Sequence, residues 1–281
     1  MDIHIIIYRP RCFPALMCDQ TSSPYPKISI VTPSLNQGEF LKETIESVLS
    51  QEYPNLEYIV MDGGSSDNTM DILRSCSDGV KWVSETDKGQ ADAINKGLRM
   101  TSGQIVAYLN ADDLLLPGAL EKVARTFLEN PEAMWVTGRC RIITETGKET
   151  RKPITAYKNL WLRIHHPSFL FITDYVSQPA TFWRSSLLAE FGYLDESLHY
   201  ALDYEYFLRF NGKYPLVILP DTLAAFRVHS QSKNANAFHK NVYVDEDQIA
   251  VYRHTNSTML RALHNIHRWL MTTVYAVMNK G

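Results

Sequence analysis

Along residues 27–130, continuous apolar runs alternate with segments in which every third or fourth residue is apolar. Short β-branched apolar runs indicate buried strands, and each run is followed by apolar residues at helical spacing. The strands are expected at residues 27–35, 56–62, 80–85 and 104–110. The helices are expected around residues 41–49 and 70–73, over 90–100, and from 117 onward. Strands and helices that alternate with short connections predict an α/β fold, with a mostly parallel central sheet covered by helices on both faces.

The second half of the chain has a less regular pattern. Its strands are expected at residues 134–144, 178–184 and 223–229, with a turn at 145–148. From about Val244 to the C-terminus the pattern is helical. We therefore expect an N-terminal extension at 1–26, one α/β domain at 27–235 and a C-terminal helical segment at 236–281.

Composition narrows the class of protein. The chain has 281 residues, of which 45% are hydrophobic, and its formal net charge of −3 offers no basic excess for a nucleic-acid partner. The cysteines form no C-x-x-C pair, so neither a zinc site nor a dense disulfide framework is expected; they are Cys12, Cys18, Cys76 and Cys140. The sequence has no signal-peptide pattern and no run of about 20 apolar residues, so we expect a cytoplasmic protein.

Polar and acidic residues follow each of the first four predicted strands. In an open parallel sheet, ligands bind beyond the carboxyl ends of the strands, so these residues are candidates for a binding site. They are Ser34, Asn36 and Gln37, then Asp62, then Glu85, Asp87 and Lys88, and finally Asn110, Asp112 and Asp113. The alternative is that they are ordinary turn and cap residues.

The adjacent acids Asp112 and Asp113 favour a binding site over a turn. Two neighbouring carboxylates repel each other unless a cation or hydrogen-bond donors compensate them. Mg²⁺ typically binds one or two carboxylates together with substrate phosphates. The pair therefore predicts a site for a diphosphate and a divalent metal. Dinucleotide-binding, P-loop and α/β-hydrolase motifs are absent from the sequence, which argues against those enzyme classes.

Six stretches of the chain, in this order and spacing, resemble family 2 glycosyltransferases. They are IVTPSLNQGEFLKETIESVLSQ, VMDGGSSDNT, SETDKGQADAINKGL, YLNADDLLLPGAL, QPATFWR and LDYEYFLR. The resemblance covers about residues 27–235 and implies a GT-A fold with a Rossmann-like sheet. It also implies transfer of a sugar, with inversion, from a nucleotide-sugar donor to an acceptor hydroxyl, with Mn²⁺ or Mg²⁺ as cofactor. A carbohydrate or lipid-linked acceptor in polysaccharide or glycoconjugate biosynthesis is the corresponding expectation.

The resemblance implies roles for individual residues. Asp62 matches the carboxylate of the nucleoside pocket, although Gly63 stands where relatives commonly have a second aspartate. Asp112 and Asp113 match a D-x-D-type motif whose first acid is replaced by Asn110, and Asp113 is the preferred metal ligand. Ser34, Asn36, Glu85, Lys88 and Asp112 are expected to bind the donor. His229 matches a histidine that in some relatives binds metal or phosphate; a structural histidine is the alternative.

Asp203 matches the catalytic base of the family, although Leu202 replaces the glutamate that often precedes it. A base is needed near the acceptor oxygen to take its proton during attack on the anomeric carbon. The alternative is that Asp203 is an acid at a helix N-terminus, where the helix dipole favours negative charge.

The C-terminal segment has apolar residues at helical spacing, with basic residues among them. The apolar residues are Leu260, Leu263, Ile266, Leu270, Val274 and Val277. Such a helix packs on the domain or in a dimer, or it lies on an anionic membrane surface at the inner face of the membrane. Two rival functions remain open from the sequence: a nucleotide-sugar-binding protein without turnover, and a sugar nucleotidyltransferase. The second normally needs a Gly-rich basic loop after the first strand, which SLNQGEF does not provide.

Overall fold

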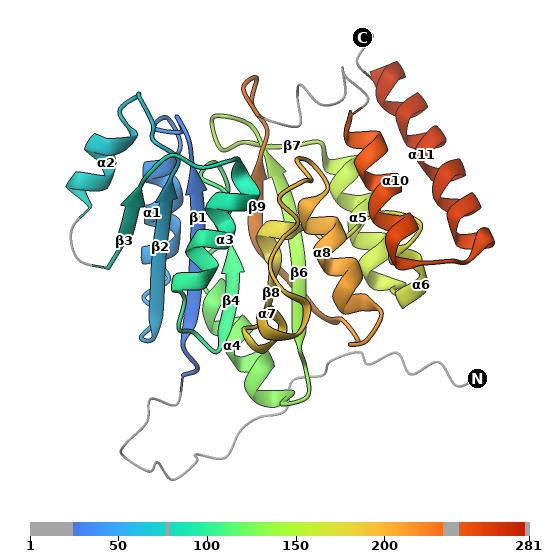
Figure 1. Cartoon of the computed structure of the whole chain (residues 1–281), viewed down its shortest axis with the longest axis horizontal. Coiled ribbons are helices and arrows are strands. Elements are labelled where there is room, and N and C mark those ends of the chain that lie inside the picture. The colour runs from blue at the N-terminus through green and yellow to red at the C-terminus, as the bar shows by residue number, and fades with distance from the viewer. Residues whose placement is uncertain (1–24, 77–78, 233–241, 279–281) are drawn as a thin grey trace.

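The computed structural model describes residues 25–76, 79–232 and 242–278, which form one α/β arrangement around a central sheet (Figure 1). Most of the predicted N-terminal extension, Cys12, Cys18 and the predicted boundary at residues 235–236 lie outside these ranges. Within them, Cys76 and Cys140 are free thiols.

The first half of the chain builds the parallel part of the sheet. Its strands are β1 (Ile28–Ser34), β2 (Leu56–Asp62), β3 (Lys81–Ser84) and β4 (Ile105–Tyr108). They lie in the order β3-β2-β1-β4, and each neighbouring pair is parallel. The four predicted strands are therefore confirmed, and their carboxyl ends meet at one edge of the sheet.

The helices of this half are α1 (Leu41–Leu49), α2 (Thr69–Ser75), α3 (Gln90–Met100) and α4 (Ala119–Glu129). Each buries most of its apolar stripe, as the spacing predicted, but Leu128, expected in the stripe of α4, is exposed. Helix α3 packs especially closely on β1 and β2, because a Cβ atom on Gly97 would lie 2.4 Å from Val31 Cγ1. A glycine at this position is what allows the close approach.

The second half makes the sheet mixed. Strand β8 (Thr181–Arg184) pairs antiparallel with both β4 and β6 (Trp135–Ile143). Strand β9 (Val217–Arg227) is parallel to β6, and the short β5 (Leu114–Leu115) and β7 (Glu149–Thr150) add antiparallel pairs. The parallel sheet that we predicted is thus formed by β1–β4. The second half adds one more parallel pair, β6 with β9, and several antiparallel pairs. Strand β9 also begins six residues earlier than its expected start at 223, with a short apolar run at residues 217–219 that Pro220 and Asp221 separate from the predicted strand.

Most helices of the second half lie toward the end of the sheet that is opposite β3, whereas α7 lies in front of β8 (Figure 1). They are α5 (Lys152–Arg163), α6 (Pro167–Leu170), α7 (Ser186–Phe191), α8 (Leu202–Asn211), α10 (Val242–His254) and α11 (Thr258–Met278), with a 3₁₀ turn η1 (Gln178–Ala180). Helix α10 packs on α8, and α11 packs on α10. Within the described ranges, no helix has the length and apolar composition needed to cross a membrane.

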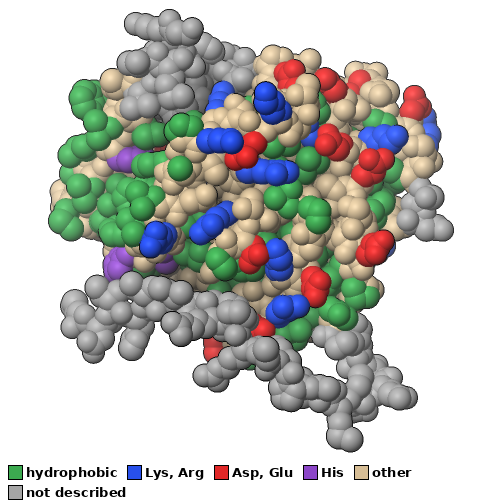
Figure 2. All heavy atoms as spheres, turned by 180° about the vertical axis from the view of Figure 1, so that it is seen from behind, with side chains coloured by type: hydrophobic (Ala, Val, Ile, Leu, Met, Phe, Trp, Pro, Cys, Tyr) green, Lys and Arg blue, Asp and Glu red, His purple; other side chains and the backbone are tan. Residues whose placement is uncertain are grey.

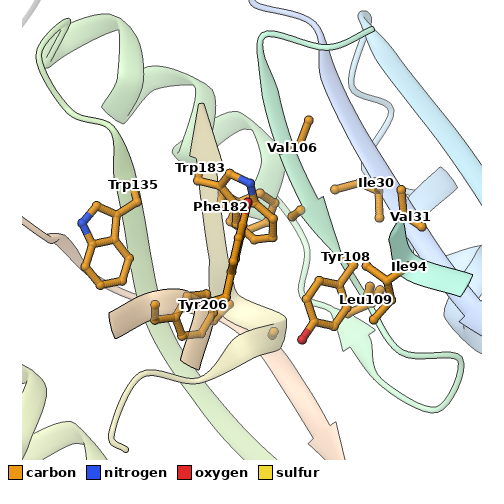
Figure 3. Close-up of a cluster of buried hydrophobic side chains, with 14 of the residues drawn as sticks. Ile30, Val31, Ile94, Val106, Tyr108, Leu109, Trp135, Phe182, Trp183 and Tyr206 are labelled. Carbon is orange, nitrogen blue, oxygen red and sulfur yellow. The ribbon is translucent and has the colours of Figure 1, made fainter. Parts of the chain in front are cut away.

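An aromatic cluster around Trp183 joins the two halves (Figure 3). Trp183, on β8, is fully buried. Its ring lies 6.4 Å from that of Tyr108 on β4 and 5.8 Å from that of Tyr206 on α8, measured between centroids. Close-packed aromatic rings hold their neighbours in fixed relative positions. The cluster therefore fixes the end of β4 relative to the helix that carries Asp203.

Candidate active site

A cleft of about 1220 Å³ opens at the carboxyl ends of β1 and β4. One wall comes from the first half of the chain and includes Ser34, Asp87 and Asp112. The other wall comes from the second half and includes Asp203 and His229. This is where the parallel sheet was expected to bind ligands.

Asp112 and His229 meet in this cleft. His229 Nε2 lies 3.0 Å from Asp112 Oδ2, and the His229 side chain is almost completely buried. The imidazole also packs on the Phe40 ring, with the centroids 4.6 Å apart. An imidazole nitrogen and a carboxylate oxygen side by side can share a proton or hold a cation together.

Arg227, at the end of β9, holds the loop that carries Asp112. Its guanidinium is buried and donates hydrogen bonds to the backbone oxygen of Asp112 (2.9 Å), the backbone oxygen of Glu145 (2.7 Å) and a carboxylate oxygen of Glu43 (2.6 Å). The buried cation is thus paired and hydrogen-bonded, as its burial requires. We did not single out Arg227 in the sequence, because these contacts join segments that are far apart in the chain.

Asp113 faces the protein interior and does not line the cleft. Its carboxylate is fully buried and accepts hydrogen bonds from the Arg227 amide (2.9 Å) and from Asn110 Nδ2 (3.2 Å). Burial, together with the charge of Asp112, raises the pKa of Asp113 well above its ordinary value. Of the two acids in the pair, Asp112 is the one beside His229.

Asn110, which replaces the first acid of the motif, connects both walls. Its amide oxygen accepts from Gln90 Nε2 at 2.8 Å, and its Nδ2 also approaches Gln178 Oε1 at 3.4 Å. Gln178 in turn donates to the backbone oxygen of Tyr108. An amide can donate and accept at once, which an aspartate at position 110 would not do.

The Ser34 hydroxyl marks a polar position on the floor of the cleft. Ser34 is buried and lines the cleft, and its Oγ has no hydrogen-bond partner among the residues that the structure describes. Buried hydroxyls nearly always have a partner in folded proteins. A ligand atom in the cleft would supply the missing one.

Asp62 organises the loop after β2 from below the cleft. Its carboxylate accepts hydrogen bonds from Ser65 Oγ (2.5 Å) and Ser84 Oγ (2.6 Å), and from the amides of Gly64 and Ser65. Asp62 is buried and is not part of the cleft lining. The residue that reaches the cleft nearby is Asp87.

The Asp87 carboxylate fills the space beside Gly63. A Cβ atom on Gly63 would lie 2.4 Å from Asp87 Oδ2. Relatives commonly have a second aspartate at the position of Gly63. In this chain the carboxylate beside that position belongs to Asp87, which follows β3. Asp87 was among the candidates after the third predicted strand, but no role in donor binding was assigned to it from the sequence.

Three other predicted donor-binding residues lie outside the cleft lining. Glu85 is exposed and pairs with Lys96 at 2.9 Å, and the exposed Lys88 uses its backbone amide to bind Asp92 Oδ2. Asn36 has a left-handed backbone (φ 52°), and its side-chain oxygen accepts from the Ser66 amide. It therefore braces the loop that follows β2.

Asp203 lies at the second position of α8 and faces the cleft. Glu205 points elsewhere: it accepts two hydrogen bonds from Arg209 Nε at 3.0 Å and lies 2.8 Å from His254 Nε2. Glu205 is therefore a structural acid, and Asp203 is the acid of this helix that a substrate can reach.

Further groups surround Asp203. Asp174 and Lys158 line the same wall. Burial raises the pKa of Asp174 to about 7; the Lys158 charge lowers it and the Asp203 charge raises it. From α10, the Glu246 carboxylate accepts hydrogen bonds from the amides of residues 199–201, which fixes the segment before α8. Neither Asp174 nor Glu246 was predicted from the sequence.

The donor set of the cleft fits a divalent cation that is shared with a substrate. Asp112 and His229 offer one oxygen and one nitrogen ligand. No group of three or more His, Cys, Asp and Glu in the described part of the chain could hold a metal ion by itself. Cations such as Mg²⁺ typically complete their coordination with phosphate oxygens and water.

Comparisons with known proteins identify the family of this chain. Residues 29–191 match the family model described as glycosyl transferase family 2. The chain is 31% identical over 189 residues to an uncharacterised glycosyltransferase of Mycobacterium tuberculosis, which covers 66% of this chain and 68% of that protein. It is 30% identical over 175 residues to the poly-beta-1,6-N-acetyl-D-glucosamine synthase of Staphylococcus epidermidis, covering 61% of this chain but only 42% of the synthase.

Solved structures share the fold at low identity. The mannosyltransferase PcManGT from Pyrobaculum calidifontis, in complex with GDP-Man and Mn²⁺, superposes with a TM-score of 0.69 at 20% identity, covering 88% of this chain and 70% of that one. Residues 1–349 of TarS from S. aureus, in complex with UDP-GlcNAc, give a TM-score of 0.60 at 16% identity, covering 84% and 69%. The predicted GT-A fold is therefore confirmed, and this chain belongs to glycosyl transferase family 2.

Proposed function

We propose that this protein transfers a sugar, with inversion, from a nucleotide-diphosphate sugar to an acceptor hydroxyl. The observation that carries the proposal is that Asp112 and His229, which are in contact, line the same cleft as Asp203. The first two suit the diphosphate of a donor, and the third suits the attacking hydroxyl.

The donor side would bind the nucleotide diphosphate. Asp112 and His229 would hold a divalent metal, Mn²⁺ or Mg²⁺, which when bound supplies positive charge to the diphosphate. We assign the metal to Asp112 because Asp113 is turned toward Arg227. The Ser34 hydroxyl would donate a hydrogen bond to the nucleotide sugar. Asp87 is the acid nearest to the space beside Gly63. Two proteins of the same fold bind GDP-Man and UDP-GlcNAc, and the donor of this chain is of that chemical class.

The acceptor side would carry the general base. Asp203 takes the proton from the acceptor hydroxyl as its oxygen bonds to the anomeric carbon. The bond from that carbon to the diphosphate breaks in the same step, and the diphosphate leaves with both electrons. A single displacement inverts the anomeric configuration. The expected acceptor is a carbohydrate or a lipid-linked sugar in polysaccharide or glycoconjugate biosynthesis, as in the S. epidermidis relative; the cytoplasmic location stays a prediction.

The two rival functions have less support. A nucleotide-sugar-binding protein needs no acid on the acceptor side, whereas Asp203 faces the cleft there. A nucleotidyltransferase needs positive charge after β1, whereas the residues of that loop that line the cleft are Leu35 and Gln37. Of the three functions, sugar transfer is the one that uses the residues on both sides of the cleft.

The test is a thermal-shift screen with UDP-, GDP-, dTDP- and CDP-sugars, each with and without Mn²⁺. A donor that binds the folded state raises the melting temperature by mass action. The stabilising donor is then incubated with sugar acceptors, and the anomeric configuration of the product is read by NMR. Stabilisation without any transfer or donor hydrolysis would favour the binding protein, and release of pyrophosphate from a nucleoside triphosphate would favour the nucleotidyltransferase.

A further inference from the structure

Helices α5 and α11 carry a group of large apolar side chains that are exposed to solvent. We call these seven residues the apolar surface: Leu160, Ile164, Met259, Leu263, Ile266, Trp269 and Leu270. Trp269 is 66% exposed and Met259 is 68% exposed. In Figure 2, hydrophobic side chains gather at the side of the molecule where these helices lie, with histidines and basic residues around them. Exposed apolar patches with a polar rim mark sites of interaction.

The two helices are in contact, so their exposed residues belong to one surface. Tyr157 on α5 stacks on His267 of α11, with the ring centroids 6.1 Å apart, and the Tyr157 hydroxyl lies 2.5 Å from His267 Nε2. Leu160 follows Tyr157 by one helical turn, and Leu270 follows His267 by one turn. Residues three positions apart lie on the same side of a helix.

Basic charge surrounds the apolar surface. Residues 151–173 and 248–278 contain seven Lys and Arg and no Asp or Glu, whereas the whole chain has a formal net charge of −3. Some of the seven are engaged elsewhere, because Arg253 pairs with Asp195 and Lys158 lines the cleft. Arg163 is exposed on α5 between Leu160 and Ile164, and Lys152 is exposed at the start of the same helix. Apolar side chains with neighbouring Lys and Arg are the pattern of a helix that lies in a membrane interface.

We propose that the apolar surface docks on a bilayer that contains anionic phospholipids. An anionic bilayer complements both the apolar side chains and the cations beside them. A second copy of the chain fits less well. A symmetric contact would bring the two sets of cations together, and these segments offer no acid to pair with them.

The position of α5 relates this surface to the cleft. Ile154, Thr155 and Lys158 of α5 line the cleft, while Tyr157 contacts α11. Docking would thus place the Asp203 wall next to the bilayer, where a lipid-anchored acceptor is located. None of the seven residues lines the cleft, so lipid binding does not depend on the proposed transfer reaction.

The experiment is co-sedimentation of the full chain with vesicles of phosphatidylglycerol and phosphatidylcholine, compared with phosphatidylcholine alone. We expect binding to the anionic vesicles only, and loss of that binding at about 0.5 M NaCl, where surface charge is screened. The double variant Ile266→Gln, Trp269→Gln should bind at least about tenfold more weakly, because two apolar side chains no longer enter the interface. Trp269 emission should shift to shorter wavelength on binding, and Trp269→Phe should remove that shift.

The matched control is Trp82→Gln with Leu128→Gln, which removes exposed apolar side chains from other parts of the molecule, at 38% and 54% exposure. It should sediment like the wild type. Both double variants should keep the wild-type melting temperature and donor-induced stabilisation, which separates lost docking from lost folding and from failure of the proposed function. The proposal is overturned if the wild type ignores anionic vesicles or if both double variants bind alike. It is also overturned if the Ile266/Trp269 variant abolishes a concentration-dependent dimer instead.

Discussion

His229 Nε2 lies 3.0 Å from Asp112 Oδ2, although 117 positions separate the two residues in the chain. The contact joins the segment after β9 to the loop after β4, and both residues line the cleft. It therefore connects the two halves of the fold at the point where a donor diphosphate would bind.

Replacement of Asp112 by asparagine should remove the metal-dependent part of donor binding. The amide is neutral, so we expect Mn²⁺-dependent affinity to fall at least about tenfold, the lower end of what disturbing a metal shell costs. Calorimetric titration of donor with and without Mn²⁺ measures this. Asp113→Asn is the control: its amide would face the Arg227 N–H, so stability should fall while metal dependence remains. The reverse pattern would restore Asp113 as the ligand, as the sequence motif favoured.

Asp203→Asn should fold and bind donor but transfer sugar at least about 100-fold more slowly, because the amide cannot accept the acceptor proton. Melting temperature, donor affinity and transfer rate are measured on one preparation. Glu205→Gln is the matched control on the same helix. It should lose stability through its contacts with Arg209 and His254, yet its folded fraction should transfer normally. An unchanged rate in folded Asp203→Asn would assign the base to another residue.

Gly63→Ala should weaken donor binding, because the new methyl group would displace the Asp87 carboxylate from the wall of the cleft. We expect a loss of roughly tenfold, and much less additional loss when Asp87→Ala is already present, since coupled neighbours are not additive. Gly212→Ala is the control, because a Cβ there meets no atom within 4 Å. If Gly63→Ala and the wild type bind donor equally, Asp87 takes no part in the donor site.

Glu57, at the start of β2, should matter for stability and not for transfer. Burial alone would raise its pKa, but hydrogen bonds from the Ser29 hydroxyl, the Ser102 amide and Lys81 outweigh it and lower the pKa to about 2. A lowered pKa in the folded state means that the stabilisation is present above the unfolded pKa of about 4.3 and is lost as the pH falls toward 2.

Glu57→Gln should therefore lower the free energy of unfolding by about 2 kcal/mol at neutral pH. Urea titrations from pH 7 down to pH 3 should show the difference from the wild type shrinking below about pH 4. Glu121→Gln, which removes an exposed pair with Arg125, should cost less than about 0.5 kcal/mol. A constant difference at all pH values would mean that Glu57 acts through packing and not through its charge.

The sequence predicted the first half of the fold well, because β1–β4 are buried runs and their helices have clear apolar stripes. Strand β2 was found at its observed bounds. Helix α5 was missed because Leu162 is its one buried residue, which leaves no stripe to detect. Strand β9 was placed too late because Pro220 and Asp221, residues typical of turns, interrupt its apolar pattern.

Part of the lining of the cleft was also predicted from the sequence. Ser34, Asp112, Asp203 and His229 line one cleft, as expected for residues at strand ends and in shared motifs. Asn36, Glu85 and Lys88 do not line the cleft. Asn36 braces the loop after β2, Glu85 pairs with Lys96, and the Lys88 amide binds Asp92. Arg227 and Glu246 could not be predicted, because their roles depend on contacts with residues 115 and 45–47 positions away.

The buried guanidinium of Arg227 keeps the site in one conformation before any ligand enters. It fixes the backbone of Asp112 through groups of the protein alone, and its own amide is bonded to the Asp113 carboxylate. The site is thus preorganised, and a cation or diphosphate that enters has little chain entropy to overcome. The Arg227 amide should accordingly exchange with deuterium as slowly before ligand binding as after it, whereas faster exchange in the free protein would reveal a site that is assembled by its ligand.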